Sequence, residues 1–204
     1  MTNYLAIDTS GSGLTVAVGG EKKAVSRLEN CALTHSVELM GEIEKTLEKA
    51  GFDKENIEVF ACSVGPGSFT GIRIGVSTVK AFGYALNKKV LAVTSFESLA
   101  YNVGKERKKL TVIDARHGNY YACGYGEKGE IFLPPCFIDK AKLEEYSKEY
   151  LVVSDTEIDG LESTVANIED GFIKAVEANL GRASLDVETV VPLYVKKSQA
   201  EEGL

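Results

Sequence analysis

The chain has 204 residues, of which 44% are hydrophobic and 26% charged, and its formal net charge is −7. This composition is ordinary for a soluble globular protein and argues against long disordered stretches. An acidic chain is a poor stand-alone binder of nucleic acids, because affinity for phosphate backbones comes mostly from Lys and Arg. If the protein works on RNA, a basic partner has to supply the contacts.

The first half of the chain is predicted to begin as antiparallel strands joined by glycine turns. These strands are expected at Tyr4–Asp8, at residues 14–18 and at Ala24–Leu28. An amphipathic helix is predicted over residues 34–50, with Thr34 or Ser36 able to cap its start and Gly51 to end it. Its predicted inner face carries apolar residues at helical spacing: Val37, Met40, Ile43, Leu47 and Ala50.

A buried strand at residues 57–64, a glycine-rich loop and a helix of small residues at 72–86 are predicted next. A strand at 90–93 and a short helix at 96–101 follow. After a polar, exposed linker at 104–109, the pattern of the first half restarts. The further elements are strands at 110–114, 120–125, 130–133 and 151–154, with helices at 143–150 and 172–180.

The predicted order of elements is therefore repeated, which indicates two domains, 1–104 and a smaller 105–204. The last segment, residues 190–197, can return to the first domain. No run approaches about 18 consecutive apolar residues and the N-terminus lacks a basic leader, so we expect a cytoplasmic protein without contact with a membrane. The four cysteines are widely spaced without a CxxC pair, which favours free thiols over disulfides or zinc.

The stretch GPGSFTGIRIG at 65–75 lies between a predicted strand and a predicted helix, where backbone N–H groups and the helix dipole favour anions. Neither phosphate-binding signature fits. The lysine of a P-loop is missing, and the glycines give GxGxxxG where dinucleotide binding needs GxGxxG. Small residues also share one helix face, so internal packing, a partner interface and ligand binding all stay open. The residues of this face are Gly71, Gly75, Thr78, Phe82 and Ala85.

Polar residues close the first strand of each half. Asp8, Thr9 and Ser10 suit either a Mg-phosphate site of the sugar-kinase type or a simple turn into a hairpin. Asp114 occupies the matching place in the second half, but no glycine stands where a phosphate would approach. The only histidines, His35 and His117, are too far apart for an HxxxH or HExxH site, and GxSxG is absent. We therefore expect no metal site and no catalytic residues.

Several blocks together resemble the TsaB family, also called YeaZ. They are IDTS (7–10), THSVELMGEIEKTLEKAG (34–51), VGPGSFTGIRIGVSTVKAFGYAL (64–86), TSFESLA (94–100), DARHGNYYA (114–122) and PLYVKKSQA (192–200). The resemblance implies an α/β fold of the ASKHA type (actin, sugar kinase, heat-shock protein), with two RNase H-like lobes and mixed sheets. The chain departs from the family in being short, with a second lobe that is trimmed at 155–170.

The resemblance implies a non-catalytic subunit that supports threonylcarbamoyl transfer to N6 of the adenosine next to the tRNA anticodon. The implied partners are a catalytic TsaD-like paralogue and a TsaE-like ATPase, with tRNA contacted indirectly and a homodimer formed when the protein is alone. The implied docking helices match residues 34–50 and 72–86. Family members are also described as glycoprotease homologues, but the histidine count argues against peptidase activity.

The interface residues expected on the docking helices are His35, Glu38, Leu39, Glu42, Ile43, Thr46, Phe69, Gly71, Arg73, Gly75, Thr78 and Phe82. No cofactor is expected, although weak binding of ATP or ADP with Mg stays open. A vestigial nucleotide site would use Asp8, Thr9, Ser10, Gly65, Gly67, Ser68 and Asp114. The alternative function is a free-standing ATPase or a sugar-kinase-like enzyme.

Overall fold

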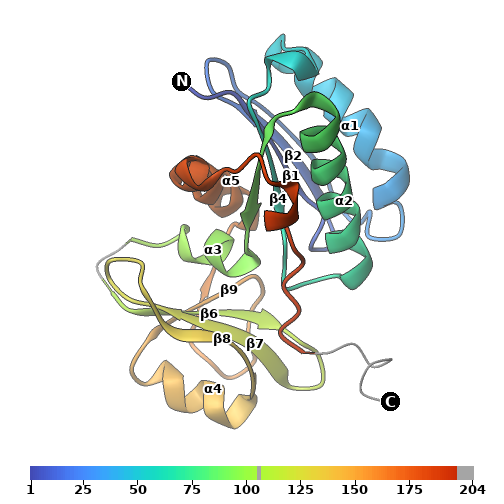
Figure 1. Ribbon diagram of the computed structural model, residues 1–204. Helices are drawn as coiled ribbons and strands as arrows, with labels where there is room; N and C mark the ends of the chain where they lie inside the picture. Colours follow the sequence, from blue (N-terminus) through green and yellow to red (C-terminus); the bar gives the residue numbers. More distant parts are fainter. Residues whose placement is uncertain (105–106, 197–204) are drawn as a thin grey trace. The chain divides into compact units, whose positions relative to one another are not determined.

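The computed structural model describes residues 1–104 and 107–196 (Figure 1). The chain divides into two compact units: Met1–Ser95 with Phe172–Pro192 forms unit 1, and Phe96–Gly171 with the chain from Leu193 forms unit 2. This division differs from the predicted boundary at residues 104 and 105, because helix α3 (Ser95–Ala100) packs Phe96 and Leu99 into the core of unit 2. The returning segment also begins well before residue 190.

Unit 1 is built on a mixed sheet of five strands within the described residues. They are β1 (Tyr4–Asp8), β2 (Leu14–Gly19), β3 (Ala24–Leu28), β4 (Val59–Ser63) and β5 (Lys89–Val93), in the order β3-β2-β1-β4-β5. The first three strands pair antiparallel, whereas β1, β4 and β5 run parallel. Parallel strands need a crossover connection, which here is a helix between β4 and β5. The strands predicted for this half are confirmed.

Helices cover both faces of this sheet (Figure 1). Helices α1 (His35–Ala50) and α2 (Phe69–Leu86) lie on one face, and the part of α5 (Ile168–Asn179) that belongs to unit 1 lies on the other. Because both faces are covered, every residue of β1 is buried. Gly51 ends α1 in the left-handed conformation, as predicted. Short 3₁₀ helices complete the described elements at Lys54–Asn56, Leu180–Arg182 and Val187–Thr189.

The inner face of α1 differs from the predicted one. Val37 and Met40, expected in the core, are exposed, while Glu42 and Thr46 are buried. The buried Glu42 carboxylate accepts hydrogen bonds from the Ser26 hydroxyl and from Lys45 Nζ, the latter at 2.6 Å. A polar residue can therefore face the sheet when its partners are built in, and hydrophobic periodicity alone misses this.

Unit 2 repeats the sheet of unit 1. Its strands are β6 (Lys109–Asp114), β7 (Asn119–Tyr125), β8 (Ile131–Asp139), β9 (Leu151–Ser154) and β10 (Thr164–Val165). They lie in the order β8-β7-β6-β9-β10, with the same antiparallel and parallel halves as in unit 1. This repeated topology confirms the predicted ASKHA-type α/β fold with two mixed sheets.

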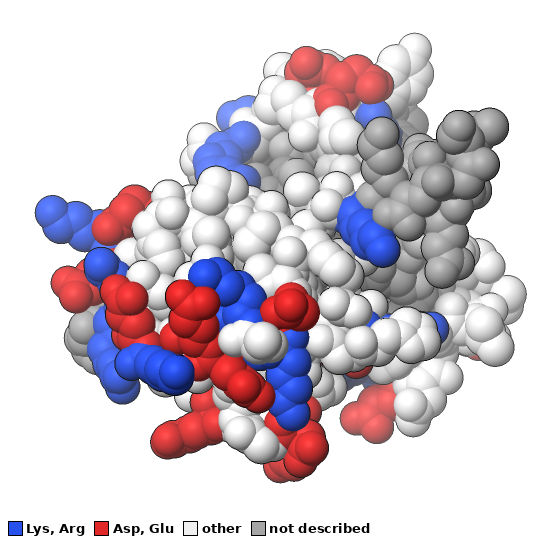
Figure 2. All heavy atoms as spheres, turned by 90° about the horizontal axis from the view of Figure 1, so that it is seen from below, with Lys and Arg blue, Asp and Glu red and all other residues white. Residues whose placement is uncertain are grey.

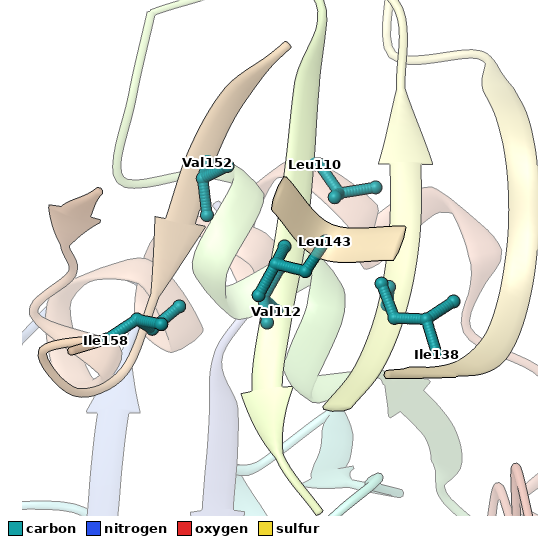
Figure 3. Close-up of a cluster of buried hydrophobic side chains, with 7 residues drawn as sticks. Leu110, Val112, Ile138, Leu143, Val152 and Ile158 are labelled. Carbon is teal, nitrogen blue, oxygen red and sulfur yellow. The ribbon is translucent and has the colours of Figure 1, made fainter. Parts of the chain in front are cut away.

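The sheet of unit 2 has an apolar cluster on each face. On one face, α4 (Lys140–Ser147) inserts Leu143 among side chains of the strands (Figure 3). The residues around it are Leu110, Val112, Ala122, Ile138, Val152 and Ile158. On the other face, Phe96 and Leu99 of α3 pack against Ile113, Cys123, Tyr125 and Val153.

The edge and the ends of unit 2 depart most from the sequence-based expectation. Strand β8 continues through Pro134 and Pro135, where the ladder with β7 has a β-bulge. Helix α4 begins before the predicted residue 143, because the Asp139 carboxylate caps it by accepting from Lys142 N at 2.8 Å. Lys109, expected in an exposed linker, is buried and donates to Gly104 O at 2.7 Å. Lys105 and Glu106 of that linker, and the tail at 197–204, lie outside the described residues.

The Asp155 side chain is half-buried in the turn after β9. Asp155 Oδ1 has no hydrogen-bond partner among the described residues. Burial raises the pKa of the Asp155 carboxyl, and the nearby Asp114 carboxylate raises it further. The folded chain therefore holds an ionised Asp155 at a cost in stability.

Replacing Asp155 with Asn should raise the free energy of unfolding at neutral pH by about 1 kcal/mol, because it removes a charge that burial and the nearby Asp114 carboxylate disfavour. The folded-state pKa is raised, so the unfolded chain loses this proton at lower pH than the folded chain does. The wild type therefore loses stability relative to D155N as pH rises from about 4. Urea unfolding at about pH 4 and at neutral pH measures the difference in unfolding free energy between wild type and D155N, with the exposed Asp159→Asn as control. A difference that stays constant with pH would contradict the account.

Candidate functional site

The glycine-rich loop and the start of α2 are tied to the end of β1. Ser68 caps α2, since its hydroxyl accepts from Gly71 N at 3.2 Å. The backbone N–H of Ser68 donates to Ser10 O at 2.7 Å. Gly65, earlier in the loop, has φ +95°, a conformation that favours glycine. The loop thus uses its own hydrogen-bonding groups to fasten α2 to the sheet.

Three glycines bring the backbone of this segment against β1 and the residues after it. A Cβ at Gly67 would lie 2.3 Å from Ser10 O, and one at Gly71 would lie 2.0 Å from Thr9 O. At Gly75 the corresponding distance is 2.7 Å to Thr9 Oγ1. The Thr9 hydroxyl also donates to Gly71 O at 2.7 Å. Of the three roles left open by the sequence, internal packing therefore describes Gly71 and Gly75, and neither lies on the surface.

Hydroxyl groups surround the buried Asp8 carboxylate at the end of β1. Asp8 Oδ1 accepts from Ser10 N at 2.8 Å and from Ser10 Oγ at 2.6 Å. The hydroxyls of Ser63 and Ser95 lie 3.2 and 3.3 Å from Ser10 Oγ. Burial raises the pKa of the Asp8 carboxyl, while donors from Ser10 and Ser63 oppose this shift. The predicted nucleotide-site residues of unit 1 are thus brought together, and their polar groups form hydrogen bonds with one another.

Asp114, the remaining residue of the predicted nucleotide site, belongs to unit 2. Its exposed carboxylate accepts from Arg116 N at 2.7 Å in the turn between β6 and β7. Arg116 and His117 both have positive φ, at 68° and 55°. The turn between β6 and β7 is therefore strained, because residues other than glycine adopt positive φ there.

Sequence reasoning missed Ser63 and Ser95 as members of the Asp8 cluster. Ser63 is the last residue of β4, and Ser95 follows β5 closely. Carboxyl ends of parallel strands meet at one edge of a sheet. The polar residues at the ends of β1, β4 and β5 could therefore have predicted this cluster.

Most residues expected at an interface on α1 face the interior of unit 1. Those buried are His35, Leu39, Glu42, Ile43 and Thr46, while Glu38 is half-buried. His35 Nε2 lies 3.2 Å from Gly13 O, and the Thr46 hydroxyl donates to Glu42 O at 2.6 Å. These five residues seat α1 on the sheet.

The expected interface residues on α2 differ in how exposed they are. Phe82 is half-buried and stacks on the buried Phe60, with ring centroids 4.9 Å apart. Thr78 is half-buried too, and its hydroxyl donates to Ile74 O at 2.8 Å. Phe69 and Arg73 are exposed, and the Arg73 guanidinium lies 3.8 Å from the centre of the Phe69 ring.

Large apolar side chains that the sequence analysis did not assign to a surface are exposed on and beside these helices. Leu33, just before α1, is 99% exposed, and Val37 and Met40 on α1 are 75% and 55% exposed. Tyr84 on α2 is 83% exposed. Large apolar side chains exposed on neighbouring helices are a signal of an interaction site.

The described residues include no group of three or more His, Cys, Asp or Glu side chains that could hold a metal ion. His35 and His117 lie in different units. The four cysteines are free thiols, and burial raises the pKa of Cys123 to about 11. No helix in the described ranges is long and apolar enough to cross a membrane.

Comparison with known proteins identifies relatives over most of the chain. The family model described as TsaD, tRNA N6-adenosine threonylcarbamoyltransferase, matches residues 29–169. The tRNA threonylcarbamoyladenosine biosynthesis protein TsaB of Buchnera aphidicola (subsp. Schizaphis graminum) is 30% identical over 163 residues, covering 74% of this chain and 77% of that protein. TsaB of Escherichia coli is 26% identical over 161 residues, covering 73% and 69%.

A solved structure has the same fold. The structure titled YeaZ from Pseudomonas aeruginosa superposes with a TM-score of 0.74 at 22% sequence identity, covering 95% of this chain and 100% of that one. The sequence matches and this fold agree with the blocks quoted above, from IDTS to PLYVKKSQA. The chain therefore belongs to the TsaB family, also called YeaZ, of tRNA threonylcarbamoyladenosine biosynthesis proteins, and it is related to TsaD.

Proposed function

We propose that this chain is the non-catalytic scaffold and activator subunit of a complex that transfers a threonylcarbamoyl group to N6 of the adenosine next to the tRNA anticodon. It binds a TsaD-like catalytic paralogue through the outer sides of α1 and α2, and a TsaE-like ATPase joins the pair. One observation carries the proposal: these two helices leave large apolar side chains in solvent, among them Val37, Met40 and Tyr84.

The proposed docking surface differs from the one first expected. It consists of the accessible side chains on and beside the two helices: Leu33, Val37, Glu38, Met40, Phe69, Arg73 and Tyr84. The buried residues of the original set act from inside, because they hold α1 and α2 on the sheet. A substitution at Gly75 cannot test this surface, since any side chain there meets Thr9 Oγ1 and would disturb the fold.

The state of the Asp8 region supports a non-catalytic role. The carboxylate is buried and bonded to Ser10, and the Ser68 N–H that would point at an anion donates to Ser10 O. A phosphate-binding helix start needs its N–H groups directed at the ligand. This supports assigning the chemistry to the paralogue.

The surface charge supports indirect contact with tRNA. In the view of Figure 2, Lys and Arg are interspersed with Asp and Glu, and the described residues of this face form no continuous basic area. With a net charge of −7, the chain relies on its partners for phosphate contacts. When the protein is alone, a second copy competes for the same apolar surface and gives a homodimer.

The second candidate function is a free-standing ATPase or sugar-kinase-like enzyme. The observation that favours it is the gathering of Asp8, Ser10, Ser63 and Ser95 at the carboxyl ends of parallel strands, where many α/β proteins bind ligands. The internal hydrogen bonds of that cluster make it the weaker candidate.

Val37→Glu and Tyr84→Glu should each weaken binding of the TsaD-like paralogue from the same organism by about tenfold or more, since a charge then replaces an apolar contact. Binding is measured by calorimetry, and complex formation by size-exclusion chromatography with light scattering. Ile131→Glu on β8 of unit 2, also an exposed apolar residue, is the matched control. Unchanged circular dichroism verifies the fold. Wild-type affinity in both variants would contradict the proposed docking surface.

Titration of the isolated chain with ATP and Mg²⁺ should give no saturable heat and no turnover. In the reconstituted complex, Asp8→Asn should leave the rate of tRNA modification unchanged within about twofold, because a structural carboxylate makes no contact with the reacting atoms. Micromolar binding with hydrolysis that D8N abolishes would instead establish the ATPase. Thermal unfolding of D8N separates loss of fold from loss of chemistry.

A further inference from the structure

An apolar groove runs along the second half of α1. Its floor is made of Met40, Ile43, Leu47, Phe52 and Phe82. Phe82 comes from α2 and is held by its stacking on Phe60. The groove therefore has a fixed base, and the exposed Met40 makes it continuous with the proposed docking surface.

Carboxylates dominate the rim of this groove. Among its lining residues, Glu44, Glu48, Asp53 and Glu55 oppose a single lysine, Lys54. Lys54 lies 3.9 Å from Glu55, so part of that end is neutralised within the chain. Within residues 1–104 and 107–196, the side chains of Glu44 and Glu48 take part in no ion pair.

The charges of α1 are segregated around its circumference. Lys45 pairs with Glu42 at 2.6 Å on the side that packs against β3, and Lys49 acts electrostatically on the same carboxylate. Two other lysines lie at the end of the groove: Lys22 Nζ is 5.6 Å from the centre of the Phe52 ring, and Lys88 donates to Glu55 O at 2.9 Å. The middle of the rim, Glu44 and Glu48, stays acidic.

We propose that this groove is the specificity-determining part of the docking surface and receives a basic side chain from a helix of the TsaD-like paralogue. An Arg or Lys lays its aliphatic stem on the apolar floor while its charged head lies between Glu44 and Glu48. The match of an apolar floor and an acidic rim to this amphipathic side chain is what selects the occupant. The inference rests on the proposed function.

The same rim acts against pairing of two identical chains. In a two-fold dimer built on this surface, each copy brings its own Glu44 and Glu48 toward the other. Like charges brought together across an interface suppress that pairing, whereas opposite charges favour it. Salt should therefore act with opposite sign on the two complexes, strengthening self-association and weakening the complex with the paralogue.

The test uses the full chain and the TsaD-like protein of the same organism, with affinity measured at about 0.1 M and about 1 M NaCl. The double variant Glu44→Lys with Glu48→Lys should bind at least about tenfold more weakly than wild type at low salt, and the difference should shrink at high salt. Glu44→Gln with Glu48→Gln, which keeps the size of the side chains, should fall between the two. Glu144→Lys on α4 is the matched control and should behave as wild type.

Light scattering of the isolated chain gives the second readout, and wild type should self-associate more at high salt than at low salt. Charge-reversed or neutralised chains that fold and bind the paralogue as tightly as the control at low salt would overturn the inference while leaving the docking proposal intact. A wild-type chain that binds no paralogue at either salt concentration would instead overturn the proposed function, and the inference with it.

Discussion

The close approach of α2 to the end of β1 is the contact on which the rest of unit 1 depends. Gly67 and Gly71 place backbone directly on the carbonyl groups of Ser10 and Thr9, and Gly75 passes the Thr9 hydroxyl. One added methyl group in such a packed contact costs about 1–3 kcal/mol. The helix can therefore lie this near the end of β1 only because Gly71 and Gly75 have no side chains. That position in turn stacks Phe82 on Phe60 and directs Phe69 and Tyr84 outward.

This contact also explains what the sequence could and could not reveal about α2. The strand, loop and helix around GPGSFTGIRIG follow from its glycines and its flanking apolar runs. Whether the small-residue face meets a partner or the chain's own sheet does not follow, because both need the same absence of side chains. The deciding fact is that Thr9 and Ser10, distant in sequence, lie under that face.

Polar residues account for most other differences between expectation and structure. On α1 the buried Glu42 and Thr46 carry their own partners, so Val37 and Met40 are left outside. The sheet of unit 1 and four strands of unit 2 were predictable from strand and turn patterns, but the short strand β10 and the ends of unit 2 were not. Strand β8 runs through Pro134 at a bulge, and a proline normally argues against a strand.

The segregation of faces on α2 has a consequence for how the proposed complex forms. Its inner side is locked to the sheet by backbone contacts, so the helix has no freedom to rotate or slide when a partner arrives. We therefore expect binding to order mainly side chains such as Tyr84, at about 0.5–1.5 kcal/mol each, and to leave the backbone of α2 unchanged. Association then resembles rigid docking, and differences in affinity between related partners should arise mainly in dissociation rates.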